Sequence, residues 1–365
     1  MSVETRPGPA GFGMSAPDER VMARFHADLG AVRRRVDARL STLFDRVVAD
    51  SAAVLEHDSP GLAPLRAMAL ANGKRIRPAF VYWAFTAAGG DPDDERVIEA
   101  GAVLELLHLF ALVHDDVMDE APVRRSRPTI HVLFADRHRA LGLRGAAERY
   151  GENMAILLGD LAFLVCGELT ASLPAPARRV FFRAATQLML GQYLDLECAA
   201  AVRHDPALYS RTALLKTASY TVEGPLLVGA ALTPRGDELA PYLRRYGRAI
   251  GEAFQHRDDL LDIFGDEQQT GKPVAGDILQ QKATRLFAIL ENHAEGADAA
   301  LLGAGALDLE SVRALLRRTG AADELERVIT GLTREAVLAI DEAPMSDACR
   351  EVLVGAAHFA GVRAW

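Results

Sequence analysis

The chain has 365 residues, half of them hydrophobic and a quarter charged, as in an ordinary globular protein that is not embedded in a membrane. Its formal net charge of −9 argues against nucleic acid as a partner, so an anionic ligand would need local basic groups or a metal ion. Three cysteines without a CxxC spacing cannot all pair with one another, which favours a reducing, cytoplasmic location.

The first 18 residues are expected to be a flexible leader, because they are rich in Pro and Gly and lack the basic start and apolar core of a signal peptide. The most apolar stretch, residues 100–113, contains Glu105 and His108 and then ends in an acidic cluster. Such an interrupted stretch is too short to cross a membrane, so no membrane span is expected. One folded domain is predicted over residues 19–365.

Apolar residues recur at helical spacing along nearly the whole chain, without a convincing alternating strand or hairpin signal. The tail after Leu307 has the pattern of further short helices. The predicted fold is therefore all-α, a single large helical bundle whose middle helices are buried. The predicted helices cover residues 19–56, 61–72, 75–89, 94–120, 147–172, 176–202, 208–232, 237–264 and 281–293.

Two acidic clusters with the pattern Asp-Asp-x-x-Asp follow apolar helical runs. They are Asp115, Asp116 and Asp119, and Asp258, Asp259 and Asp262. In each, the first and last aspartates lie four residues apart and share one helix face. Pro122 and Gly265 follow, which places the carboxylates near helix C-termini, where the helix dipole disfavours negative charge.

One such cluster alone is best explained as a solvated helix end. Two clusters in apolar helices instead indicate bound cations, and oxygen ligands favour Mg²⁺. We expect the two helices, from different halves of the chain, to face one another across a cavity.

Basic residues accompany both clusters. They are Lys74 and Arg77 in GKRIRP, Arg124 and Arg125 after the first cluster, Lys216 in an apolar helix, and Lys272 and Lys282 after the second cluster. Any one of them could be a solvent-facing cation, although the apolar neighbours of Lys216 argue against that for this residue. The acidic clusters and these basic residues together indicate a site that binds a polyphosphate through metal ions. Because the sequence has no P-loop or GxGxxG motif, the favoured ligand is a diphosphate with an apolar tail.

From about residue 25 to 360 the chain resembles the trans-polyprenyl diphosphate synthases of the isoprenoid synthase superfamily. Five motifs occur in the family's order: GKRIRP, HDDVMDEAPVRRSRPTIH, GQYLDL, LLKTASY and FQHRDDLLDIFGDEQQTGKPVAGD. The resemblance implies an isoprenoid synthase fold around a central apolar cavity, and a homodimer. It also implies condensation of isopentenyl diphosphate with dimethylallyl, geranyl or farnesyl diphosphate.

The resemblance assigns roles to single residues. Asp115, Asp119 and Asp258 would bind three Mg²⁺ ions, with Asp116, Asp259 and Asp262 binding or supporting them. The allylic diphosphate would contact Arg124, Lys216 and Lys272, and isopentenyl diphosphate would contact Lys74, Arg77, His108 and Arg125. Oxygen atoms of Thr217 and Gln255 would stabilise the allylic carbocation, and the released diphosphate would take up the proton.

Some of these residues have a second interpretation. By spacing alone, His108 is equally well explained as a buried histidine bonded to nearby backbone, and Gln192 and Asp195 as a buried polar pair. The chain also departs from the family twice, since Ser126 and Gln281 replace usual glycines. A non-glycine residue at positive φ costs energy, so we expect a slightly different loop at Ser126, and the role of Lys282 rests on weaker grounds than that of Lys272.

Product length is expected to depend on Phe110 and Ala111, which lie five and four residues before Asp115. In family members of this pattern, one aromatic at the fifth position acts as a floor and favours geranylgeranyl diphosphate, with farnesyl diphosphate or a longer product as alternatives. On a helical wheel, however, Ala111 lies almost beneath Asp115 and Phe110 lies well off that line.

A class I terpene cyclase and a non-catalytic partner subunit are the competing classes. A cyclase would carry a different second metal motif and would not need Lys74, Arg77 and Arg125, whereas a partner subunit would be expected to have lost one acidic cluster.

Overall fold

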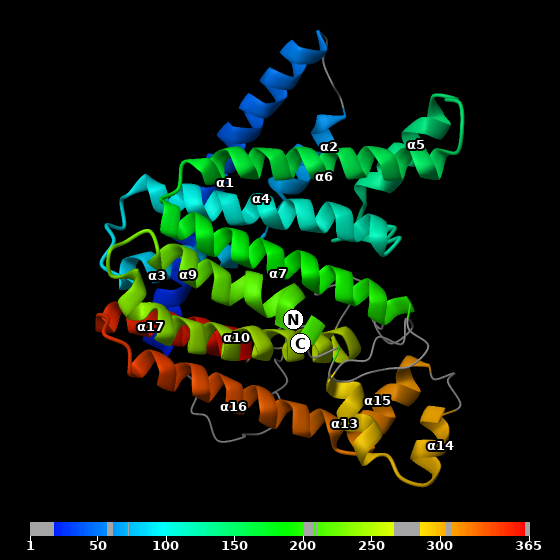
Figure 1. The fold of residues 1–365 in the computed structure, drawn as a ribbon. Helices are drawn as coiled ribbons and strands as arrows, with labels where there is room; N and C mark the ends of the chain where they lie inside the picture. Colours follow the sequence, from blue (N-terminus) through cyan, green and yellow to red (C-terminus); the bar gives the residue numbers. More distant parts are fainter. Residues whose placement is uncertain are drawn as a thin grey trace, which may run out of the picture. The chain divides into compact units, whose positions relative to one another are not determined.

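The computed structural model describes residues 18–56, 61–71, 73–200, 208, 211–212, 214–265, 285–303 and 308–361. In these residues the protein is helical apart from one very small hairpin, which confirms the all-α prediction (Figure 1). The chain divides into two compact units. The first-cluster unit holds residues 26–185 and 224–241, and the second-cluster unit holds residues up to 25, 186–223 and from 242 onward. The expected single domain stays a prediction.

Helix α4 (Glu95–Met118) is the central helix of the first-cluster unit. Its side chains are apolar around nearly the whole circumference, so most of them are buried. Asp94 caps its start by accepting a hydrogen bond from the backbone N–H of Arg96. The helices α2 (Leu62–Ala69), α3 (Ile76–Ala87), α5 (Ile130–Ala140), α6 (Ala147–Ala171) and α9 (Gly224–Ala230) pack against α4.

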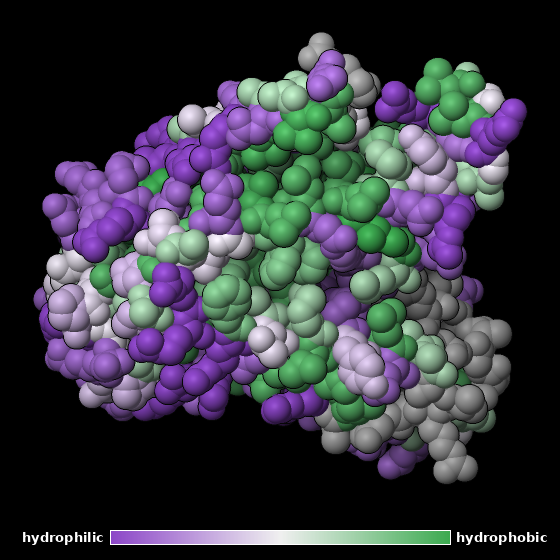
Figure 2. Space-filling view, turned by 45° about the horizontal axis from the view of Figure 1, so that its top comes forward, coloured by the Kyte–Doolittle hydropathy of each residue, from purple (hydrophilic) through white to green (hydrophobic). Residues whose placement is uncertain are grey.

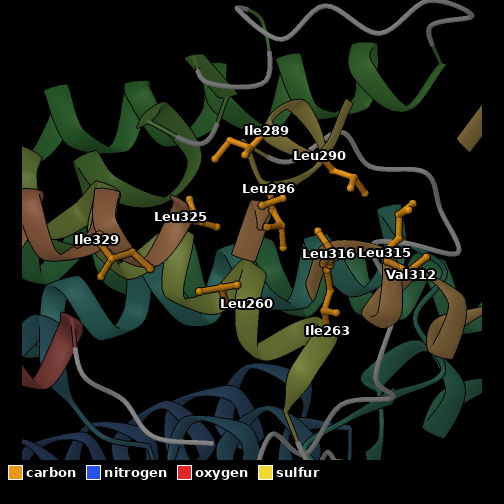
Figure 3. Close-up of a cluster of buried hydrophobic side chains, with 12 residues drawn as sticks. Leu260, Ile263, Leu286, Ile289, Leu290, Val312, Leu315, Leu316, Leu325 and Ile329 are labelled. Atoms are coloured by element: carbon orange, nitrogen blue, oxygen red, sulfur yellow. The ribbon is translucent and has the colours of Figure 1, made fainter. Parts of the chain in front are cut away.

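Three long helices, α1 (Glu19–Leu55), α7 (Ala175–Ala200) and α10 (Gly236–Phe264), contribute residues to both units. The other elements of the second-cluster unit are η1 (Leu214–Glu223), α13 (Arg285–His293), α14 (Ala297–Gly303), α15 (Leu309–Arg318), α16 (Ala321–Asp341) and α17 (Asp347–Gly361). The apolar faces of α10, α13, α15 and α16 meet in one core, to which Leu260, Leu286 and Leu316 contribute (Figure 3). Each such side chain stabilises the fold by about 2 kcal/mol through burial.

The helices lie close to their predicted positions, but three features differ. Residues 208–232 are not one α-helix, since η1 is a π-helix that is followed by α9. Helix α5 was not predicted at all. In the tail, α16 is 21 residues long rather than short.

A hairpin between α4 and α5 contradicts the expectation that no hairpin would occur. Its strands β1 (Val123–Arg124) and β2 (Arg127–Pro128) are antiparallel, and the two residues between them, Arg125 and Ser126, both have positive φ (51° and 58°). This is the backbone of a tight two-residue hairpin. Ser126 therefore adopts the left-handed conformation despite its side chain, at a cost of about 1 kcal/mol.

In the part of the chain that the structure describes, α4 and α6 are long and apolar enough to cross a membrane, with mean hydropathies of 1.7 and 1.8. The core of the first-cluster unit accounts for this in α4, where 72% of the apolar window is buried inside the protein. The expected absence of a membrane span stays a prediction.

Candidate functional site

The first acidic cluster lies where α4 ends, as predicted. The backbone N–H of Ala121 donates to the carbonyl of Asp116 (2.9 Å), and that of Glu120 donates to the carbonyl of Val117 (3.2 Å). Glu120 has a φ of 49°, so the helix closes with the left-handed cap that glycine usually provides. The backbone itself therefore stops the helix directly after Asp119.

Arg124 returns from the hairpin onto this cluster. Its Nε donates to Oδ1 of Asp116 (2.6 Å), and one terminal nitrogen donates to Oδ2 of Asp115 (3.3 Å). Burial raises the pKa of Asp116 to about 6, because the loss of hydration and the charges of Asp115 and Asp119 outweigh the attraction of Arg124. The cluster thus holds more negative charge than one arginine neutralises.

Four partly accessible residues at the C-terminal half of α4 and its C-cap share one stripe at helical spacing. They are His108, Ala111, Asp115 and Asp119. Phe110 is only 8% exposed and lies on another side, in agreement with the helical wheel. The stripe therefore leads from the first cluster past Ala111 to His108.

Phe110 instead faces α6, where it belongs to an aromatic ladder of Phe163, Phe110 and His114. The ring centroid of Phe110 lies 4.9 Å from that of Phe163 and 4.7 Å from that of His114. A Cβ at Gly159 would overlap the ring of His114, so this glycine lets the ladder pack directly on the α6 backbone.

Four arginines of the same unit act electrostatically on His108, and this group of positive charges is here termed the cationic pocket. Burial and the positive charges of Arg77, Arg125, Arg124 and Arg75 hold the pKa of His108 well below its usual value. Loss of hydration and the charge of Arg124 also lower the pKa of Arg125. The charges of Arg77 and Arg125 thus act on His108, and a neutral histidine among guanidinium groups suits an anion. The isopentenyl diphosphate site stays a prediction.

In the second-cluster unit, Lys216 of η1 forms an ion pair with Asp195 of α7, with Nζ 2.7 Å from Oδ2. A Cβ at Gly191 would collide with the backbone of Lys216, so this glycine allows α7 and η1 to approach closely. Asp195 is therefore the partner of Lys216, which is predicted to bind the diphosphate. π-Helical segments are frequent at functional sites. The side chain of Thr217 lies outside the described residues.

The second acidic cluster repeats the burial pattern of the first. Asp258 and Asp262 are partly accessible, whereas Asp259 is 6% exposed. Oδ1 of Asp259 accepts a hydrogen bond from Nε2 of Gln255 (2.9 Å), and His256 lies on its other side. Burial alone would lower the pKa of His256, but the carboxylates of Asp259 and Glu252 outweigh it and raise the pKa.

The arginines near this cluster bond away from it. Arg257 forms a forked pair with the carboxylate of Glu326 (2.6 and 2.7 Å) and donates to the carbonyl of Gly361. Arg313 donates to the carbonyl of Ile263 at the C-terminal end of α10 (2.7 Å). These contacts hold the helix that carries the cluster, and no sequence motif predicts them.

Lys272 and Lys282, as well as Gln281, lie outside the described residues. In the described part of the chain, no three acidic, histidine or cysteine side chains converge on one point as a ready-made metal site. The donors nevertheless fit a hard divalent cation, because each cluster has two accessible carboxylates one helical turn apart and an excess of negative charge.

Comparison with known proteins agrees with these features. The family model for polyprenyl synthetase matches residues 62–315. The short chain isoprenyl diphosphate synthase of Methanothermobacter thermautotrophicus is 32% identical over 305 residues, which are 79% of this chain and 86% of that protein. The geranylgeranyl diphosphate synthase of Mycobacterium tuberculosis is 34% identical over 289 residues, 75% of this chain and 77% of that protein.

A farnesyl diphosphate synthase of Mycobacterium tuberculosis is 38% identical over 221 residues, 58% of this chain and 55% of that protein. Among solved structures, geranylgeranyl pyrophosphate synthase from Corynebacterium glutamicum, complexed with isoprenyl diphosphate and magnesium, is similar with a TM-score of 0.80. The two sequences are 31% identical, and the match covers 92% of this chain and 99% of that one. Relatives with different products are thus similarly close.

Proposed function

Because the chain belongs to the polyprenyl synthetase family and is a short-chain prenyltransferase, we propose that it joins isopentenyl diphosphate to an allylic diphosphate to make geranylgeranyl diphosphate. The observation that carries this proposal is that one unit holds both candidate diphosphate sites, an acidic one and a cationic one. The accessible carboxylates of the first cluster lie on the same stripe of α4 as His108, which the cationic pocket surrounds.

The first cluster would bind the allylic diphosphate through Mg²⁺. We propose three ions, held by Asp115, Asp119 and Asp258, with Asp259 and Asp262 contributing. When bound, Mg²⁺ supplies positive charge that makes the diphosphate a better leaving group. Asp116 would keep its place beside Arg124, which holds its carboxylate at 2.6 Å.

The chemistry then needs no protein nucleophile. The bond between C1 and oxygen of the allylic substrate breaks, and the electron pair leaves with the diphosphate. The double bond of isopentenyl diphosphate attacks the carbocation, and the departed diphosphate takes up the proton that is lost. Lys216, held by Asp195, would balance the charge of the leaving group, and Gln255 and Thr217 would stabilise the carbocation.

Isopentenyl diphosphate would bind in the cationic pocket. The guanidinium groups of Arg77 and Arg125 would contact its phosphate oxygens, and His108, whose pKa lies well below its usual value, could donate one N–H to them. Lys74, which lies in the same GKRIRP turn as Arg77, is exposed and would contact the diphosphate from the solvent side.

Geranylgeranyl diphosphate is proposed as the product because one aromatic side chain, Phe110, stands near the first cluster while Ala111 leaves the stripe open. In the structure the ring of Phe110 is supported by Phe163, so the wall of the growing chain would be formed by α4 and α6 together. Farnesyl diphosphate and longer products are the alternatives.

We also propose a homodimer that uses the outer face of α6. Leu157 and Leu164 on this helix are 61% and 69% exposed, and Ile156 and Phe163 of the same helix are 40% and 39% exposed. Figure 2 shows hydrophobic residues gathered on one face of the molecule. Exposed apolar area of this kind is typical of a protein interface. Leu164→Asp is expected to give the monomer mass in solution, whereas Leu338→Asp on α16, also exposed, should leave the dimer intact.

A cytoplasmic location is proposed from the three free cysteines, Cys166, Cys198 and Cys349, none of which is in a disulfide.

The deciding experiment is incubation with Mg²⁺ and dimethylallyl, geranyl or farnesyl diphosphate, with and without isopentenyl diphosphate. Elongated diphosphates are expected only when both substrates are present. A hydrocarbon product without isopentenyl diphosphate would show a cyclase, and no turnover with any primer would favour a non-catalytic subunit.

A further inference from the structure

Arg75 differs from the other two cations of the GKRIRP turn. Lys74 is exposed and Arg77 is half-buried, but Arg75 is only 7% exposed. It precedes α3 as its N-cap residue and adopts the left-handed conformation (φ 52°, ψ 38°), which a residue with a side chain rarely takes. The surrounding structure must therefore hold Arg75 in place.

Its guanidinium group is bonded to three other elements. Nε donates to Oδ1 of Asp37 on α1 (2.7 Å), and Nη1 donates to Oε2 of Glu105 on α4 (2.5 Å). Nη2 donates to the carbonyl of Ala69, the last residue of α2 (2.7 Å). Burial disfavours the charge of Arg75, but the carboxylates of Glu105 and Asp37 outweigh it and raise its pKa. All three nitrogens of the guanidinium group thus donate hydrogen bonds to other parts of the protein.

The bond to Glu105 connects Arg75 with the helix that carries His108 of the cationic pocket. Glu105 lies one helical turn before His108 on α4, and its negative charge also acts on Arg125. Arg75 is the direct neighbour of Lys74 and lies two residues before Arg77. A change in its ion pairs would therefore move the turn that carries both of these cations relative to His108.

We propose that Arg75 is a positioning residue, which uses its ion pairs with Glu105 and Asp37 to aim Lys74 and Arg77 at isopentenyl diphosphate without contacting it. This inference rests on the proposed function. Glu105 acts as the built-in counter-charge of the pocket, so that several arginines can gather around His108 before an anionic ligand arrives.

Asp37→Asn is the most useful variant, because Asp37 is partly exposed and its loss leaves Glu105 in place to hold Arg75. Arg75→Met is the stronger change and carries a risk of unfolding. We expect Asp37→Asn to raise the KM for isopentenyl diphosphate about tenfold, while kcat and the KM for the allylic diphosphate stay within about twofold. Thermal unfolding should confirm that the variant is folded.

Glu99→Gln is the matched control. Glu99 of α4 forms a forked ion pair with Arg39 of α1 (2.6 and 2.8 Å), so it joins the same two helices without touching the GKRIRP turn. This variant should leave both KM values unchanged. Equal changes in the two KM values of Asp37→Asn, or the same effect in Glu99→Gln, would overturn the inference.

Arg77→Met separates this inference from the proposed function. If Arg77→Met leaves the KM for isopentenyl diphosphate unchanged, the proposed binding site itself is wrong. If Arg77→Met raises this KM and Asp37→Asn does not, the binding site stands and the positioning role of Arg75 is wrong.

Discussion

In the first acidic cluster the buried aspartate, Asp116, binds Arg124, whereas in the second the buried aspartate, Asp259, accepts a hydrogen bond from Gln255. The two clusters share their spacing and their pattern of accessible and buried carboxylates. They differ in where the nearby arginines bond. Arg124 neutralises part of the first cluster directly, but Arg257 and Arg313 hold the backbone and neighbours of α10.

The comparison shows that one sequence pattern can be supported in two ways. In the first cluster a cation from the next hairpin contacts the carboxylates themselves, so charge balance is local. In the second, an arginine bonded at the C-terminal end of α10 opposes the helix dipole, and a forked ion pair to Glu326 holds the helix in place. We therefore expect Arg124 to matter for catalysis and Arg257 to matter for stability.

The largest expected effect tests what the clusters share. Asp115→Ala and Asp258→Ala should each lower kcat by about 10³-fold, because each removes an accessible carboxylate that is expected to bind Mg²⁺. Product formation measured over a range of Mg²⁺ concentrations checks this. Asp45→Ala, which breaks an exposed ion pair with Arg66, is the control. Full activity in either cluster variant would remove that cluster from the proposed site.

The next largest effect compares the loss of the arginine near each cluster, Arg257 and Arg124. Arg257→Met should lower the free energy of unfolding by about 2 kcal/mol, because it leaves the half-buried carboxylate of Glu326 without its forked partner. Arg124→Met should cost less, about 1 kcal/mol, because Asp116, whose pKa is already raised to about 6, can take up a proton when Arg124 is lost; it should reduce kcat/KM for the allylic substrate more strongly. Denaturant unfolding and steady-state kinetics measure both.

Arg245→Met is the control, because its ion pair with Glu342 is exposed and should contribute almost nothing to stability. The distinction between the clusters would be wrong if Arg124→Met destabilised the protein more than Arg257→Met.

Product length should depend on the first cluster's surroundings. Phe110 lies five residues before Asp115, while the equivalent residue before Asp258 is Ala253. Phe110→Ala should add at least one five-carbon unit to the main product, and Phe163→Ala should shift the product in the same direction because it removes the support of the Phe110 ring. Chromatography of the dephosphorylated products measures this.

Val54→Ala on α1, which is 82% exposed and outside the ladder, should leave the product unchanged. An unchanged profile for Phe110→Ala would refute the role of this residue as a floor. A change with Phe110→Ala but not with Phe163→Ala would assign the floor to α4 alone.

The smallest effect concerns the hairpin that brings Arg124 to the first cluster. Ser126→Gly should raise the free energy of unfolding by about 0.5 kcal/mol, since glycine adopts positive φ more easily but loses more entropy on folding. Activity should stay unchanged. A lower melting temperature would show that the Ser126 side chain makes a compensating contact.

Most helices, although not α5, and both clusters could be predicted because helical spacing is a local property of the sequence. The hairpin could not, since its strands have only two residues each and its turn lacks the usual Asn-Gly pair. The π-helix η1 was also missed, because bonding to the fifth residue leaves no clear mark in the spacing.

Contacts between residues far apart in the chain could not be predicted from the sequence either. In the sequence Glu105 stands out only as a charge that interrupts an apolar run, and its partner Arg75 lies 30 residues away. The same is true of Arg257 and Glu326, which are 69 residues apart. The facing arrangement of the two clusters, and the roles assigned to Lys272 and Lys282, stay predictions.

The cap that ends α4 has a consequence for how strongly the first cluster can hold an ion. Backbone hydrogen bonds at Glu120 and Ala121 fix the chain around Asp115 and Asp119 without any help from a ligand. The proposed site would therefore be preorganised, and binding an ion would need only the adjustment of side-chain rotamers. The entropy lost on binding would be small, so most of the attraction between ion and carboxylates would appear as affinity.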